Sequence, residues 1–137
     1  MLTQARIALG MQRSLDNAAH RAATGGIPAT STIPVREALA WVTLEGARML
    51  RQQDRIGSLA AGKQADLVLI RADGLNMQPV HDAVASVVFQ ASLANIDSVM
   101  VAGQWKKRQG KLVGVELAEG LKELQASGRK IAAALAL

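Results

Sequence analysis

The spacing of the apolar residues changes near Arg51, and this change constrains the fold more than any other feature of the sequence. Before that point apolar residues recur every three or four positions, which is typical of amphipathic helices. After it, short continuous apolar runs stand between glycine turns, which is typical of β-strands. The sequence therefore predicts an α+β fold with a helical segment over 1–51, a β-rich segment over 52–114 and a C-terminal helix over 115–137.

The helical segment contains three predicted helices. The first covers 2–22, and its apolar stripe is expected on one face, at Ala8, Met11, Leu15, Ala18 and Ala22. Thr32 or Ser31 is expected to cap the second helix, with Pro34 in its first turn. Thr43 is expected to cap a short third helix over 44–50.

The β-rich segment has one strand that is more apolar than the others. Residues 66–70 form a continuous apolar run, which predicts a strand covered on both faces. Gly62 lies in the turn before it and can take a positive φ at little cost. An extended piece is expected at 56–59, a loop at 71–79, and either a helix or a strand at 80–90. Strands are expected at 96–102 and 104–108, joined by a tight turn at Gly103. A second turn at Gln109-Gly110 is expected to lead into a returning strand at 111–113.

The tail is predicted to be helical because Leu117, Leu121, Leu124, Ile131 and Leu135 follow a four-three pattern. We expect this tail helix to lie on the core of the protein rather than to form a coiled coil.

Composition excludes several classes of protein. The chain has no Cys, so a disulfide scaffold and a thiolate metal site are excluded, and its core must be aliphatic because Tyr is absent and Phe occurs once. The net charge is +5, but the basic residues are spread out and aromatic platforms are lacking, so no nucleic-acid partner is expected. No apolar run could span a bilayer and no signal peptide is recognisable, so no membrane association and a cytoplasmic location are expected.

The residues that could carry chemistry are few and scattered. His20 and His81 lie far apart without metal-ligand spacing, and each is interpreted as a surface or capping residue. Asp66 is expected to accept amide hydrogen bonds from the turn at Gly62-Lys63. Asp97 is expected to accept similar hydrogen bonds before the next strand. No nucleophile elbow or phosphate-binding loop is present. The sequence thus predicts no catalytic, cofactor-binding or metal-binding residue in this chain.

Three stretches in order resemble the amidohydrolase superfamily, in particular its cytosine-deaminase and chlorohydrolase type. Residues 37–50 (EALAWVTLEGARML) resemble a helix pair near the end of the family's barrel, and 56–70 (IGSLAAGKQADLVLI) resemble the segment that follows. Residues 99–105 with 109–112 resemble the next strands, with Ala102 in place of the usual Asp and Ala61 in place of the usual Pro.

This resemblance implies helices from the end of a TIM-like barrel, a small antiparallel or mixed β-sheet left from a composite β-sandwich, and a C-terminal helix. It implies a metal-dependent hydrolase of non-peptide C–N bonds, as in deamination, with zinc or iron held by a His-x-His pair, a later His and a final Asp. None of these ligand positions exists in this chain, so it is expected to be a truncated, barrel-less part that is inactive alone and holds no cofactor.

In the family the apolar faces of these helices pack on the barrel, which this chain lacks, so the chain is expected to associate. Either copies of the chain associate with one another, or a partner chain supplies the barrel. The alternatives to a fragment or a split enzyme are a non-catalytic oligomeric scaffold or binding module that retains the fold and, less favoured, a basic nucleic-acid accessory protein.

Overall fold

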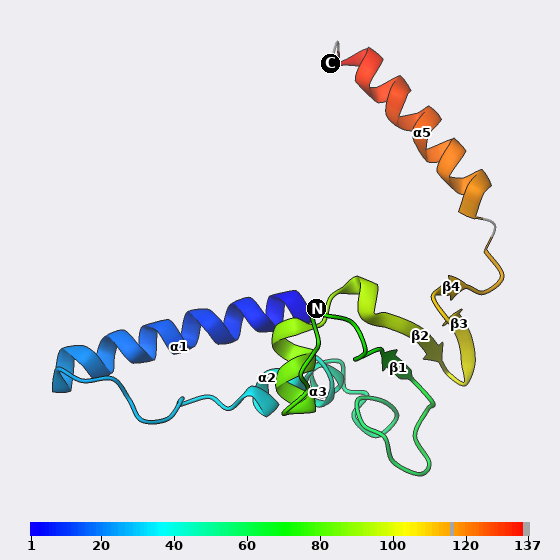
Figure 1. Cartoon of the computed structure of the whole chain (residues 1–137). Helices are drawn as coiled ribbons and strands as arrows, with labels where there is room; N and C mark the ends of the chain where they lie inside the picture. Colours follow the sequence, from blue (N-terminus) through cyan, green and yellow to red (C-terminus); the bar gives the residue numbers. More distant parts are fainter. Residues whose placement is uncertain (116, 136–137) are drawn as a thin grey trace.

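The described residues form three helices ahead of a small sheet, short helical turns between its first two strands, and a separate terminal helix (Figure 1). The computed structural model describes residues 1–115 and 117–135. The helical segment contains α1 (Leu2–Thr24), α2 (Val35–Trp41) and α3 (Leu44–Met49). Gly25 ends α1 with φ 74°, which glycine adopts without steric strain. No helix in the described part of the chain is long and apolar enough to cross a bilayer.

The face of α1 that packs on the rest of the chain differs from the predicted stripe. Ala5 and Leu9 are buried, whereas Met11 and Leu15 are each 63% exposed. The contact face is held by two arginines that bracket Leu9. Arg6 donates through Nε to the carbonyl of Val88 and through Nη2 to that of Ala91, both at 2.8 Å. Distant carbonyl groups thus decide the orientation of the helix, and Met11 and Leu15 of the predicted stripe stay exposed among the described residues.

The core lies where α1 crosses α2 and the helical turn near residue 88. Leu9, Ala38 and Val88 are fully buried there, and Trp41 packs against them as a half-buried neighbour. Arg13 of α1 adds a second anchor, since its Nη2 donates to the carbonyl of Ile33 at 2.8 Å. This core is small for 137 residues.

The predicted capping hydrogen bonds of α2 and α3 do not form. The residue before α2 is Pro34, and the Thr32 hydroxyl donates to the Asp16 carboxylate of α1 instead. Thr43 does precede α3, as predicted, but its hydroxyl donates to the Leu39 carbonyl at 2.8 Å. The Thr32 hydroxyl therefore holds the α1–α2 loop on α1, and the Thr43 hydroxyl ties the start of α3 to α2.

Residues 56–59 were predicted to be extended, and this prediction is wrong. Residues 56–58 are bends and Leu59 has no regular secondary structure, and the Ile56 amide donates to the Gln52 carbonyl at 2.9 Å. Gly57, with φ 89°, lies against the first turn of α3, and a side chain there would meet the Cβ of Ala47 at 2.6 Å. Close packing on a helix therefore overrides the local preference of this apolar stretch.

The sheet is antiparallel and has the order β1-β2-β3-β4. Its strands are β1 (Leu67–Ile70), β2 (Ile96–Val101), β3 (Gln104–Arg108) and β4 (Lys111–Leu112). The predicted tight turns are confirmed. Ala102 and Gly103 have φ 49° and 79°, and Gln109 and Gly110 have φ 48° and 79°, the backbone of hairpin turns that match the strand twist.

The strand β1 is not covered on both faces, contrary to the prediction from its apolar run. It forms an edge of the sheet, and Val68 and Leu69 are 56% and 48% exposed. The apolar pattern is that of an interior strand, but the described residues include no segment that covers it.

The stretch whose pattern suited both a helix and a strand is helical. It contains α4 (Ala83–Ala85), which Asp82 caps by accepting hydrogen bonds from the amides of Val84 and Ala85, and the π-helical turn Ser86–Gln90. The 3-10 turn Leu93–Asn95 then leads into β2.

The C-terminal helix forms as predicted, with α5 at Leu117–Ala134, but the prediction that it lies on a core is wrong for its described residues. Residues 116 and 136–137 of the predicted span lie outside the described part. No side chain of α5 is buried, and the helix extends away from the remaining elements (Figure 1). The fold is therefore α+β with a four-stranded antiparallel sheet.

Candidate functional site

The two histidines lie in different parts of the structure. His20 is half-buried near the C-terminal end of α1, and its carbonyl accepts a hydrogen bond from the Thr24 hydroxyl at 2.9 Å. His81 is exposed, next to the helix cap Asp82. Among the described residues, no three His, Cys, Asp or Glu side chains come together in a way that could hold a metal ion.

The aspartates that sequence analysis singled out have structural contacts, but with other partners than expected. Asp66 accepts the Ala102 amide at 2.7 Å through Oδ1, so it fastens the β2–β3 turn rather than the turn at Gly62. Asp97 lies inside β2 and accepts the hydroxyl of the adjacent Ser98 at 2.7 Å. The antiparallel pairing of β1 with β2 brings the Ala102 amide, which is distant in sequence, into hydrogen-bonding distance of Asp66.

Asp16 and Asp73, whose carboxyl groups have a lowered pKa, lie at the surface. Hydrogen bonds from Thr32 and, less strongly, Gln12 lower the pKa of Asp16. A hydrogen bond from Arg71 lowers the pKa of Asp73, and the same contact raises the pKa of Arg71. These shifts arise from contacts between exposed side chains, so they do not indicate a general acid or base in a cleft.

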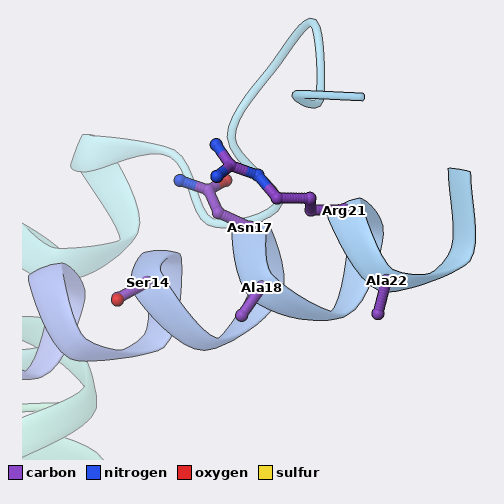
Figure 2. A pocket seen from close by; sticks show the side chains of 5 residues that line it. All are labelled: Ser14, Asn17, Ala18, Arg21 and Ala22. Atoms are coloured by element: carbon purple, nitrogen blue, oxygen red, sulfur yellow. The ribbon is translucent and has the colours of Figure 1, made fainter. Parts of the chain in front are cut away.

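One hollow of about 460 Å³ lies along a single helix, α1. Figure 2 shows Asn17 and Arg21 pointing to the side of the loop that follows the helix, while Ser14, Ala18 and Ala22 lie along the other side. These side chains include no carboxylate and no imidazole. The hollow therefore lacks groups for acid–base or metal chemistry.

A larger groove of about 810 Å³ lies between the helices and the sheet. Its walls come from the start of α1, from α2 and α3, from residues 56–59, from β1 and from the segment between residues 91 and 96. Apolar residues dominate them: Met1, Leu2, Leu39, Met49, Leu50, Ile56, Leu59, Leu67, Val68, Leu69, Leu93 and Ile96. The only ionisable side chain in the lining is that of Asp66. This apolar groove is suited to packing against polypeptide, and it holds no constellation for catalysis.

The sequence did not predict this groove, because its walls are far apart along the chain. The one local signal was the apolar run at 66–70, whose residues would otherwise have to face water.

Comparison with known proteins identifies the family. Residues 1–106 match the amidohydrolase family. The chain belongs to this family. It is 33% identical over 101 residues to a 5-methylthioadenosine/S-adenosylhomocysteine deaminase of Desulforudis audaxviator, an alignment that covers 74% of this chain and 24% of that protein. It is 42% identical over 81 residues to the 8-oxoguanine deaminase of Pseudomonas aeruginosa, covering 59% of this chain and 18% of that protein.

A solved amidohydrolase has the same fold over almost the whole chain. An adenosine deaminase from Xanthomonas campestris, determined with bound zinc, superimposes with a TM-score of 0.82 at 29% identity. The superposition covers 96% of this chain and 27% of that one. The chain thus spans about a quarter of the length of the relatives that it matches.

The zinc of that relative has no counterpart among the described residues of this chain. A hydrolytic zinc site takes three or four His, Asp, Glu or Cys ligands, and the two histidines here are not joined by further ligands. The residues described therefore do not fit a zinc ion.

Proposed function

We propose that this chain forms the C-terminal quarter of a metal-dependent hydrolase that cleaves non-peptide C–N bonds, as a deaminase does, and that it has no activity alone. The observation that carries the proposal is the family match over residues 1–106, in a chain that spans about a quarter of relatives named as deaminases. The catalytic and metal-binding groups would reside in a TIM-like barrel contributed by other residues. We place this assembly in the cytoplasm.

The role of this chain in such an enzyme is structural. In this proposal α1, α2 and α3 are outer helices at the end of the barrel, and the sheet belongs to a composite β-sandwich. The apolar groove supports this role, since its walls require covering by polypeptide and its lining lacks groups that could move a proton apart from Asp66. Asp66 is already bonded to the Ala102 amide.

A graft tests the proposal. The segment of the Desulforudis audaxviator deaminase that aligns with this chain is replaced by this chain, and ammonia release from 5-methylthioadenosine is measured along with bound zinc. We expect the graft to release ammonia and hold zinc, whereas the same deaminase lacking the segment and this chain alone do neither. Ammonia release by the isolated chain, or an inactive graft that is folded and loaded with zinc, would refute the proposal.

A further inference from the structure

We infer that Arg6 is a positioning residue for the hydrolytic reaction, because it fixes the start of α1 and with it the loop that enters α1 from the preceding barrel strand. The inference rests on the proposed function, since it takes α1 as an outer helix at the end of the barrel. The observation that carries it is the place of the Arg6 side chain, between the beginning of α1 and the helical turn Ser86–Gln90.

Arg6 binds the C-terminal end of this helical turn. Its Nε donates to the carbonyl of Val88 and its Nη2 to that of Ala91, both at 2.8 Å. The last carbonyls of a helical turn lack partners within the turn, and a buried carbonyl without a partner is costly. Val88 is fully buried and Ala91 is 4% exposed, so water has little access to either. The planar guanidinium can reach both carbonyls at once, whereas a lysine ammonium is a single point charge.

This contact lies next to the first turn of the helix. The Ala5 amide closes that turn by donating to the Met1 carbonyl at 3.0 Å, and Ala5 is buried. Arg6 follows Ala5 directly, so its two hydrogen bonds hold the first turn against the segment between β1 and β2. Residues 1–3 and 91–93 line the same groove, and α1 begins beside these helical turns and runs away from them (Figure 1).

The first turn of α1 belongs to the catalytic end of the proposed barrel. In a (β/α)8 barrel each outer helix begins at the end where its strand finishes, and the loops from strand to helix at that end supply the catalytic residues. The loop that enters α1 is one of these loops. A displacement of about 1 Å far from the reacting atoms can lower turnover roughly a hundredfold. Arg6 therefore acts on the reaction through the loop and does not itself touch the substrate.

Arg13 is a matched control on the same helix. It is half-buried, as Arg6 is, and its Nε and Nη2 donate to the Ile33 carbonyl at 3.2 and 2.8 Å. It lies about two turns further from the start of α1. Its hydrogen bonds anchor the middle of α1 to the loop before α2, so they stabilise the helix without holding its first turn.

The graft of this chain into the Desulforudis audaxviator deaminase tests the inference, with Arg6→Met and Arg13→Met made in the graft. The measurements are kcat and KM for 5-methylthioadenosine, bound zinc, the urea midpoint and amide hydrogen exchange. We expect both variants to lower the urea midpoint alike. Only Arg6→Met should lower kcat, by roughly tenfold or more at unchanged KM and zinc content, and only Arg6→Met should speed exchange in residues 2–6.

Arg6→Lys is the second variant, and it decides the test if Arg6→Met does not fold. Lysine keeps the positive charge but not the two-carbonyl contact, so we expect a kcat below that of wild type. A wild-type kcat in the folded Arg6 variants overturns the inference, and so does an equal loss of kcat in the Arg6 and Arg13 variants. These outcomes leave the proposed function intact, whereas a folded, zinc-loaded graft that is inactive with Arg6 in place refutes that function and this inference with it.

Discussion

Two glycines with nearly the same backbone conformation allow steric overlap to be measured separately from backbone strain. Gly57 has φ +89° and Gly62 has φ +85°. A Cβ at Gly57 would lie 2.6 Å from the Cβ of Ala47 and 3.1 Å from the carbonyl oxygen of Thr43. A Cβ at Gly62 would meet nothing within 4 Å. The two Gly→Ala variants thus share the strain, and only one of them adds a clash.

The expected magnitudes follow from these distances. An L-residue in the left-handed region costs about 1–2 kcal/mol, so Gly62→Ala should lower the free energy of unfolding by about that amount. Gly57→Ala adds the cost of overpacking against the buried Ala47, about 1–3 kcal/mol. The total for Gly57→Ala is therefore about 2–5 kcal/mol.

Urea unfolding followed by circular dichroism at 222 nm measures the difference, with all proteins at one concentration because association would shift the midpoint. With a slope of about 1–3 kcal/mol per molar urea, the midpoint of Gly57→Ala should fall below that of Gly62→Ala by roughly 1 M. Equal midpoints would refute the reasoning, since they would mean that α3 and the 52–58 turns are not in close contact.

Two further predictions concern a turn and a surface carboxylate. Ala102 has φ 49°, so Ala102→Asn should raise the free energy of unfolding by about 0.5–1 kcal/mol, because asparagine tolerates the left-handed region better than alanine; a lower urea midpoint would contradict this. Thr32→Val removes the main hydrogen bond that lowers the pKa of Asp16, so that pKa should rise toward its ordinary value of 3.8 in carboxyl-carbon NMR titrations. Since the folded-state pKa of Asp16 is depressed, its stabilising effect is present above about pH 3.8 and is lost as the pH falls below it. In Thr32→Val this acid-induced loss should shrink, and an unchanged Asp16 titration would show that the Thr32 contact does not form in solution.

The candidate site could not have been located from the sequence. The sequence predicted no catalytic or metal-binding residue in the chain, and the structure presents an apolar groove whose walls include residues from Met1 to Ile96. A groove assembled from segments this far apart has no local sequence signature. Only the apolar run at 66–70 indicated that something should cover β1.

The sequence by itself determined the local elements and the family. The helices, the β2–β3 hairpin with Gly103 at its turn and the positive φ of Gly62 all depend on the torsional preferences of neighbouring residues, which are encoded within a few positions. The motifs at 37–50 and 56–70 resemble amidohydrolases, and the match over residues 1–106 confirms the family.

The tertiary structure alone decided three features. These are the face of α1 that is buried, the amide that donates to Asp66, and the bent backbone within residues 56–59, which were expected to be extended. Each of these depends on a contact between distant segments, such as Arg6 with the Val88 carbonyl, 82 residues away. The energies of such contacts depend on which segments meet in space, and hydrophobic periodicity along one segment contains no information about that meeting.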